Sequence, residues 1–191
     1  MAPICEFFFD LNSSYSYLAS TQLAGLAQRT GARIVLVPML LGAITKATGS
    51  NVGPMQRLQY TARDMLRWAE RYRIPFTLPS SWPTRSVLGL RCVLAAGEGR
   101  EAAMHALFRA FWAEGKDIAD AAVVRDALGA AGMDAERILA GAESPPIKDE
   151  LRKNTDGALE RGVFGAPTFF VGEEMFWGND RLDFVEAALR K

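Results

Sequence analysis

The residues that could do chemistry lie near the two ends of the sequence. Ser13-Ser14-Tyr15-Ser16 follows an apolar run, and Ala166-Pro167 precedes a run of β-forming residues. A serine at the start of a helix lies among unpaired backbone N–H groups, where the helix dipole favours an anion. A hydroxyl there can donate to a bound thiolate and keep it ionised. The alternative is that Ser13 or Ser14 is only the helix N-cap, a position where serine is preferred.

The side chains of this sequence do not supply that thiol. Cys5 and Cys92 are far apart in apolar surroundings, so we interpret both as buried core residues. Two such cysteines build neither a disulfide framework nor a zinc site, and we predict no metal site. His105 is the sole histidine and lies on an apolar helical stretch, which favours a structural role over Ser-His or Cys-His catalysis. A thiol at Ser13 must therefore come from a ligand.

The composition limits the kind of partner. The chain has 191 residues, of which 49% are hydrophobic, so it can bury a sizeable core. Acidic and basic residues number 22 each, which argues against nucleic acid or an anionic membrane surface. The N-terminus has no basic n-region, and no stretch approaches the ~20 apolar residues of a membrane span. We expect a cytoplasmic protein with a small-molecule partner.

The first 40 residues predict a βαβ unit. Residues 4–9 and 34–37 are short apolar runs that read as buried strands. Parallel strands joined by a helix must form a right-handed crossover. One apolar helix face is predicted between the strands, ending before Gly31, from residues spaced three and four apart: Tyr15, Ala19, Leu23, Leu26 and Ala27.

The C-terminal residues complete a thioredoxin pattern. Residues 168–171 and 175–177 are predicted strands joined by a short turn, and a helix is predicted over residues 180–189. In this pattern Ala166-Pro167 is a cis-proline at the entry of an edge strand, which leaves the backbone of Ala166 free to pair with a peptide-like ligand. The alternative is an ordinary trans proline, since only about 5–6% of such bonds are cis.

The middle of the chain is predicted to be helical almost throughout. We therefore predict an α/β fold, a thioredoxin-like domain with a large all-helical insertion. The predicted parts are residues 1–40 for the N-terminal βαβ part, 41–160 for the insertion and 161–191 for the C-terminal ββα part. The helical periodicity covers residues 58–72, 87–96, 101–113, 121–130, 135–140 and 147–160.

Several polar residues have both a structural and a ligand-binding interpretation. Asn179 or Asp180 could be the N-cap of the last helix. Alternatively, Asp180 could bind an α-amino group while free N–H groups bind an α-carboxylate, and a γ-glutamyl moiety carries both groups. Lys46, Asn51 and Arg85 are either solvated surface side chains or, if they lie over a thiol site, contacts to an acidic substrate.

Together these motifs resemble the 2-hydroxychromene-2-carboxylate isomerase family, relatives of kappa-class glutathione transferases within the DsbA-like thioredoxin superfamily. The likeness covers nearly the whole chain and runs in order through residues 9–19, 51–54, 162–168 and 175–181. The resemblance implies a glutathione-dependent isomerase of aromatic-ring catabolism that interconverts 2-hydroxychromene-2-carboxylate and trans-o-hydroxybenzylidenepyruvate. It also implies a homodimer and a small aromatic carboxylate as substrate.

The resemblance also implies roles for individual residues. Ser13 is the expected glutathione-activating residue, although many relatives have proline where this chain has Ser14, so Ser14 could share or replace that role. The cysteinyl part of glutathione is expected at Ala166 with Pro167, and its γ-glutamyl part at Trp177, Asn179 and Asp180. Substrate contacts are expected at Lys46, Asn51, Val52 and Arg85.

The implied reaction needs no histidine. Addition of the glutathione thiolate to a cis-benzylidenepyruvate turns its double bond into a single bond, and rotation followed by elimination gives the trans isomer. Two alternatives remain: a kappa-like transferase that releases a glutathione conjugate, and a non-catalytic thioredoxin-like module that binds glutathione or a peptide. A disulfide oxidoreductase is disfavoured because the sequence lacks Cys-x-x-Cys at this helix.

Overall fold

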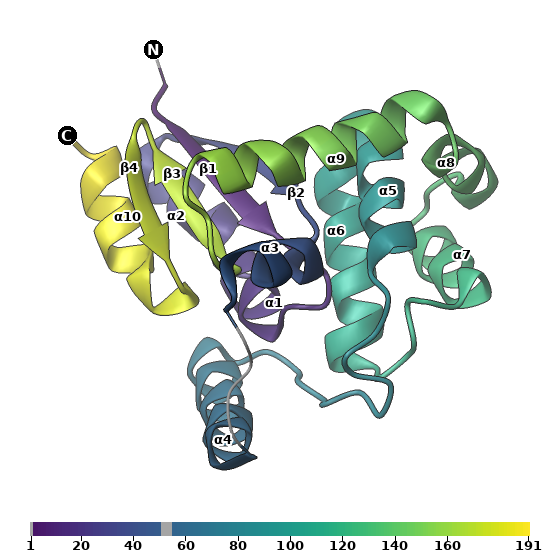
Figure 1. Ribbon diagram of the computed structural model, residues 1–191, viewed down its shortest axis with the longest axis horizontal. Coiled ribbons are helices and arrows are strands. Elements are labelled where there is room, and N and C mark those ends of the chain that lie inside the picture. The colour runs from purple at the N-terminus through teal and green to yellow at the C-terminus, as the bar shows by residue number, and fades with distance from the viewer. Residues whose placement is uncertain (1, 51–54) are drawn as a thin grey trace.

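The two ends of the chain build one mixed sheet. The structure, a computed structural model, describes residues 2–50 and 55–191. The strands of this sheet are β1 at Ile4–Phe9, β2 at Arg33–Pro38, β3 at Thr168–Val171 and β4 at Glu174–Trp177. β1 pairs with β2 in parallel and with β3 in antiparallel fashion, and β3 pairs antiparallel with β4 (Figure 1). The predicted thioredoxin-like sheet is confirmed, and its order is β2-β1-β3-β4.

Both faces of β1 are packed, which explains its run of apolar residues. Side chains alternate along a strand. Cys5, Phe7 and Phe9 belong to the larger core, whereas Phe8 joins a smaller cluster on the other face. The Phe7 ring stacks on Phe9 with centroids 5.1 Å apart and on Phe169 of β3 with centroids 5.2 Å apart. These aromatic contacts fasten the first strand to the C-terminal hairpin.

The single helix predicted after β1 is two helices. α1 spans Ser14–Ser20 and α2 spans Leu23–Thr30. At the break, the Thr21 hydroxyl donates to the carbonyl oxygen of Leu18 over 2.7 Å. Such bonds from a side chain to its own preceding turn compete with a regular helix. The apolar spacing continues across the break, so the hydrophobic pattern alone does not reveal it.

The chain between β2 and β3 contains only helices and connections in its described residues. Figure 1 shows α5 to α8 grouped beside the sheet, with α9 running from that group back along the sheet. The prediction of an all-helical segment is confirmed. The helices are α3 at Leu41–Thr48, α4 at Met55–Tyr72, α5 at Val87–Ala95, α6 at Arg100–Phe108, α7 at Ala121–Ala130, α8 at Ala135–Ala142 and α9 at Pro145–Glu160.

The end of α6 ties the helical segment to the turn after β1. α6 continues as a π-helical turn over Arg109–Ala113, where the sequence predicts one continuous helix. Trp112 in this turn is fully buried, and its Nε1 donates to the carbonyl oxygen of Leu11 over 2.9 Å. A buried indole N–H needs such a partner. The bond fixes the helical group against the loop that leads into α1.

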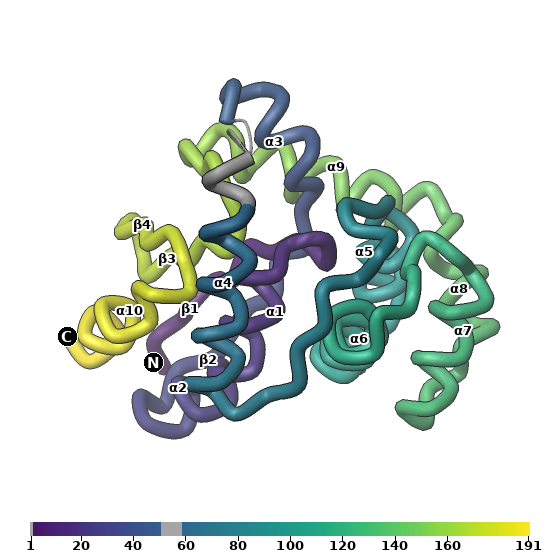
Figure 2. Tube along the Cα trace, turned by 90° about the horizontal axis from the view of Figure 1, so that it is seen from below, coloured from purple at the N-terminus to yellow at the C-terminus, as the bar shows by residue number. Residues whose placement is uncertain are grey.

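Helix α4 stands apart from the rest of the helical segment. Figure 2 shows it crossing over α1, away from α5 to α8. Met65 and Ala69 form its buried side, while Leu66 is exposed. The Tyr15 hydroxyl of α1 donates to the Asp64 carboxylate over 2.8 Å. Although α4 is 18 residues long, no helix within residues 2–50 and 55–191 is long and apolar enough to cross a membrane.

The last helix begins later than the sequence predicts. A 3-10 turn at Asn179–Arg181 precedes α10, which spans Leu182–Leu189. Arg181 occupies the N-cap position of α10, and its side chain makes no capping hydrogen bond. The interpretation of Asn179 or Asp180 as the N-cap of this helix is therefore wrong, because both residues lie in the turn before it. Their side chains are left for another role.

Candidate active site

Ser13 closes the turn that follows β1. Its N–H donates to the carbonyl oxygen of Asp10 over 3.0 Å, and its extended backbone leads into α1. The Ser13 Oγ accepts from the N–H of Ser16 at 3.2 Å and donates to the carbonyl oxygen of Ala166 at 3.1 Å. Ser13 is therefore the N-cap of α1, and it also joins α1 to the loop before β3. The N-cap interpretation of Ser13 is confirmed, and its role as a donor to a thiolate stays a prediction.

The loop before β3 has the predicted cis bond. The Ala166–Pro167 peptide bond is cis. The carbonyl oxygen of Pro167 accepts from the N–H of Gly178 over 3.0 Å, which fixes the loop against the end of β4. A side chain at Gly165 has no room, because its Cβ would lie 2.4 Å from Nε1 of Trp177. Close packing of this loop thus sets the backbone of Ala166 beside Ser13.

A cavity of about 650 Å³ opens beside Ser13. It lies between the starts of α1 and α3, helix α4 and the loop before β3. Phe164 and Trp177 form one aromatic wall, with ring centroids 4.8 Å apart. The apolar and aromatic side chains of the lining suit a flat, apolar ligand; they are Leu41, Met65, Trp82, Phe164 and Trp177.

A second cavity of about 500 Å³ adjoins the first. The two share lining residues, including Tyr15, Ala166 and Trp177, and the second extends to Asn179 and Asp180. Ala166 thus stands at the boundary between them. The structure therefore brings six of the predicted site residues to one continuous region: Ser13, Ala166, Pro167, Trp177, Asn179 and Asp180.

Asn179 has a buried donor without a protein partner. The residue is 3% exposed, and its Nδ2 has no hydrogen-bond acceptor within the described part of the chain. Its backbone carbonyl accepts from the Tyr72 hydroxyl at 3.5 Å. An unsatisfied buried N–H costs free energy and needs an explanation. Because Asn179 lines the second cavity, the orphaned amide points to an acceptor on a ligand.

Tyr15 and Asp64 also belong to this region, and the sequence reasoning missed them as site residues. Tyr15 lines both cavities, and its hydroxyl donates to Asp64 over 2.8 Å. Burial, followed by the bond to Asp64, raises the pKa of the Tyr15 phenol, which stays protonated at neutral pH. The sequence places Tyr15 next to Ser13 and Ser14, which is a usable signal. Asp64 carries none, since it reads as a helix surface residue.

The residues expected to contact substrate are not gathered in the same way. Lys46 in the last turn of α3 and Arg85 before α5 are exposed, and neither lines either cavity. Thr45, beside Lys46, does line the first cavity. Asn51 and Val52 lie outside the described residues. The expectation of a convergent substrate contact therefore finds no support in the positions of Lys46 and Arg85.

Asp10 is a buried carboxylate that holds together two backbone segments next to the first cavity. The residue is 2% exposed, and its carboxylate accepts from the N–H of Asn12 at 2.9 Å and the N–H of Leu41 at 2.7 Å. Burial raises the pKa of Asp10, and hydrogen bonds, including one with Ser86, oppose that rise. The carboxylate joins the turn before α1 to the start of α3. It thereby fixes two walls of the first cavity.

The two cysteines stand away from both cavities. Cys5 and Cys92 are buried and free, as predicted. Burial, with a smaller contribution from a neighbouring glutamate, raises the pKa of each thiol to about 12. Because the thiolate is the nucleophilic form, neither cysteine is reactive at neutral pH.

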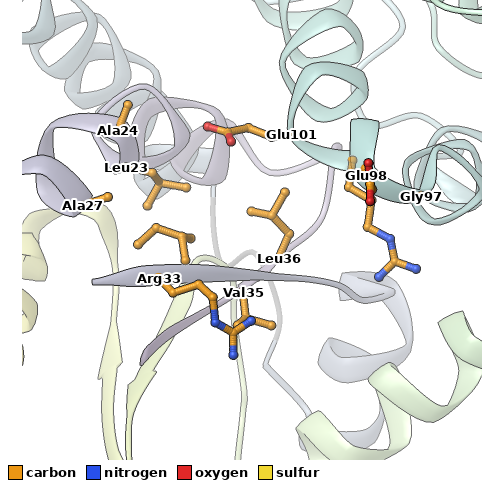
Figure 3. Close-up of a pocket in the computed structure, with 11 residues that line it drawn as sticks. Leu23, Ala24, Ala27, Arg33, Val35, Leu36, Gly97, Glu98 and Glu101 are labelled. Atoms are coloured by element: carbon orange, nitrogen blue, oxygen red, sulfur yellow. The ribbon is translucent and has the colours of Figure 1, made fainter. Parts of the chain in front are cut away.

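A further cavity lies elsewhere in the described residues. It measures about 830 Å³ and lies between α2, β2 and the start of α6. Figure 3 shows Leu23 and Leu36 facing this space, with Glu98 and Glu101 on the opposite side. It contains none of the described residues predicted for the site. Its size alone assigns it no chemistry.

The chain is similar to known proteins over nearly its whole length. The model of the DSBA-like thioredoxin domain family matches residues 4–190. A 2-hydroxychromene-2-carboxylate isomerase of Sphingobium xenophagum is 37% identical over 195 residues, covering 99% of each chain. The solved structure of a 2-hydroxychromene-2-carboxylate isomerase superposes with a TM-score of 0.87 at 33% identity, covering 97% of this chain and 94% of that chain. A glutathione S-transferase kappa 2 of Caenorhabditis elegans is 27% identical, covering 95% of this chain and 89% of that protein.

Proposed function

Because the chain belongs to the DSBA-like thioredoxin domain family and to the 2-hydroxychromene-2-carboxylate isomerase family, we propose that it interconverts 2-hydroxychromene-2-carboxylate and trans-o-hydroxybenzylidenepyruvate with glutathione as cofactor. The observation that carries the proposal is the position of Ser13. Its hydroxyl lies 3.1 Å from the carbonyl oxygen of Ala166, the residue at the boundary of the two cavities.

The second cavity fits the γ-glutamyl end of glutathione. The orphaned Nδ2 of Asn179 can donate to an α-carboxylate, and the half-exposed carboxylate of Asp180 can pair with an α-ammonium. Asp64, which accepts from Tyr15, is a further carboxylate in this cavity, and Arg181 is a cation beside Asp180. Charges of both signs suit a zwitterionic group. The cysteinyl part would then follow the backbone of Ala166 toward Ser13.

When bound, glutathione supplies a thiolate that adds to the conjugated double bond of the ring-opened substrate and leaves again after rotation. A thiol with a pKa near ~8.5 is mostly protonated at neutral pH, so the site must favour the ionised form. Ser13 does this by donating its hydroxyl hydrogen to sulfur. A hydroxyl rotates freely about its C–O bond, so it can turn from Ala166 to another acceptor without movement of the backbone.

The first cavity provides the place for the aromatic ring. The apolar and aromatic side chains of its lining offer flat surfaces to the ring. Ser13 lines this cavity, so a thiol held at Ser13 faces the ring's side chain. The first cavity is therefore the substrate half of the proposed site, and the second cavity is the cofactor half.

A second candidate is a transferase that releases a glutathione conjugate. It is favoured by the similarity to a kappa-class glutathione transferase. The two candidates need the same thiolate and differ in whether elimination follows addition. A cytoplasmic location and a homodimer belong to the proposal as well, and light scattering of the purified protein tests the dimer.

The direct test follows the absorbance of 2-hydroxychromene-2-carboxylate with and without glutathione, and identifies the product by mass spectrometry. The expected result is glutathione-dependent formation of the trans isomer without net loss of glutathione. Accumulation of a glutathione adduct would favour the transferase. Glutathione binding without any turnover would favour the non-catalytic module.

A further inference from the structure

The loop before α5 reaches over to the turn before Ser13 and is fastened there. Nε1 of Trp82 donates to the carbonyl oxygen of Asn12 over 3.1 Å, and the N–H of Thr84 donates to Oδ1 of Asn12 over 3.1 Å. The Thr84 hydroxyl in turn donates a hydrogen bond to Oδ1 of Asp117 over 2.6 Å. Asn12 thus makes two bonds to one loop, through its backbone and through its side chain.

These bonds give Trp82 a fixed position on the cavity wall. The ring of Trp82 packs on the buried ring of Trp112, with centroids 6.2 Å apart and an angle of 58° between their planes. Trp82 is partly exposed and lines the first cavity. Its indole is therefore supported from behind and pinned at Nε1, and it presents aromatic surface to the space beside Ser13. A ring held in this way is a ready surface for another aromatic ring.

The same bonds determine the orientation of the Asn12 amide. Because Oδ1 accepts from a backbone N–H, Nδ2 is the amide atom directed elsewhere. Among the described residues no acceptor pairs with this Nδ2, and Asn12 is partly exposed and lines the first cavity. A preset side-chain donor therefore stands one residue before Ser13.

The first cavity has no cationic side chain in its described lining, which gives the Asn12 amide a role as a neutral donor. Within its described lining there is neither lysine nor arginine, and Lys46 and Arg85 do not line it. A ligand with an acidic side chain must then satisfy its oxygens with neutral donors. The primary amide of Asn12 can donate two hydrogen bonds, whereas each hydroxyl of the lining can donate one.

Resting on the proposed function, we propose that Asn12 and Trp82 form the specificity element of the substrate half. Trp82 packs against the aromatic ring, and Nδ2 of Asn12 donates to an oxygen of the α-keto carboxylate. The class of ligand is a planar aromatic compound that carries a short keto-acid side chain. Both residues act in binding, so they set the KM for the aromatic substrate rather than the activation of the thiol.

The test measures binding of trans-o-hydroxybenzylidenepyruvate in the absence of glutathione, by titration calorimetry of the full chain. Four variants form two matched pairs. Asn12→Asp keeps the acceptor for Thr84 and removes the donor, and Asn12→Leu removes the donor without adding charge. Trp82→Phe keeps a ring and loses Nε1, and Trp82→Leu removes the ring. The glutathione dissociation constant and the thermal midpoint of each variant report whether the fold and the cofactor half are intact.

Saturable binding to the wild type is expected. Asn12→Asp and Asn12→Leu should both bind about ten- to hundredfold more weakly, as expected for a hydrogen bond to a charged group. Trp82→Leu should bind about tenfold more weakly, and Trp82→Phe should retain most of the affinity. In turnover assays Asn12→Leu should raise KM with little change in kcat, the signature of lost ground-state binding.

Three results would overturn the inference: no binding to the wild type, equal binding of all Asn12 proteins, or a loss in Asn12→Asp alone, which would mean charge repulsion only. These outcomes are separate from the proposed function. If the Asn12 and Trp82 variants lose affinity as expected but no variant or wild type shows glutathione-dependent turnover, the ligand site is supported and the isomerase function is contradicted. Glutathione-dependent turnover with an unchanged KM in Asn12→Leu would support the isomerase function and contradict the role of Asn12 in substrate binding.

Discussion

The hydroxyl of Ser13 donates to the carbonyl oxygen of Ala166 over 3.1 Å, although the two residues are 153 positions apart in the chain. The Oγ of Ser13 also accepts from the N–H of Ser16 and so caps α1. One side chain therefore holds the start of the first helix, contacts the loop before β3 and lines the cavity. Its removal should affect stability and turnover by separable amounts.

Ser13→Ala should lower turnover about ten- to hundredfold, because a hydrogen bond to a charged group contributes about 1.5–3 kcal/mol. Loss of the cap should also reduce the free energy of unfolding by about 1 kcal/mol. Ser13→Gly is the matched control, since glycine at an N-cap costs only a few tenths of a kcal/mol and also lacks the donor. Steady-state rates and urea unfolding of both variants check this. Near wild-type turnover in Ser13→Gly would show that Ser13 is only a cap.

The pH dependence of turnover should move with Ser13 and not with Ser14. Without the donor, the pKa of the bound thiol rises, so the thiolate forms at higher pH and the acid limb of the pH–rate profile of Ser13→Ala shifts upward. Ser14→Ala should shift it little, because Ser14 is already part of α1 and does not cap it. Profiles of kcat/KM for both variants decide the matter. An equal shift in both would mean that Ser14 shares the role.

Tyr15→Phe should weaken glutathione binding. The variant keeps the ring and loses the hydrogen bond to Asp64 that joins α1 to α4. Because that bond involves a carboxylate, its loss should raise the glutathione dissociation constant about tenfold, with a smaller change in kcat at saturating glutathione. Titration calorimetry measures it. Tyr17→Phe is a suitable control, since the Tyr17 hydroxyl donates to the carbonyl oxygen of Pro75, and Tyr17 lines neither cavity.

The double variant Cys5→Ser, Cys92→Ser should retain turnover. Burial raises the pKa of each thiol to about 12, so neither forms a thiolate at neutral pH. Placing two hydroxyls in the core should lower the free energy of unfolding. Turnover of the folded variant, with glutathione binding measured in parallel, checks this. Lost turnover with intact glutathione binding would require a mechanism based on an intrinsic thiol.

Asp10 should make stability depend on pH. Burial raises its pKa in the folded protein above the ordinary value of 3.8, so the folded state binds a proton that the unfolded state has released. Its contribution to stability is therefore greatest below that ordinary value and declines as pH rises through the raised pKa. Asp10→Asn has no such proton. The stability of wild type relative to Asp10→Asn should fall as pH rises from about 4, measured by urea unfolding. A difference that rises with pH would contradict the raised pKa.

The sequence predicts the four strands of this fold well. Residues 4–9 are predicted as a strand and β1 has the same bounds, because a mostly apolar run, interrupted by Glu6, ends at the buried carboxylate of Asp10. The predicted cis bond at Pro167 is confirmed, but the edge position predicted for the strand that follows is wrong, because β3 lies between β1 and β4. Local patterns of this kind depend on residues close together in the chain.

The sequence does not predict the contacts between elements that lie far apart in the chain. The bond between Tyr15 and Asp64 depends on how α4 crosses α1, and helical periodicity specifies a face without its partner. The bonds of Asn12 to the loop around Trp82 join residues 70 positions apart. The division into residues 1–40, 41–160 and 161–191 likewise stays a prediction, since an order of elements does not by itself define independent units.

The pairing of β1 with β3 has a consequence for how the protein is made. β1 leaves the ribosome more than 150 residues before its partner Phe169 and the loop with Ala166. Until then the edge of β1 that pairs with β3 has no hydrogen-bonded neighbour, and unpaired strand edges are sites of aggregation. Ser13 likewise acquires its second contact only after Ala166 has been made. The nascent chain must shield β1 while the intervening residues are made, and the region around Ser13 assembles only after the loop with Ala166 is complete.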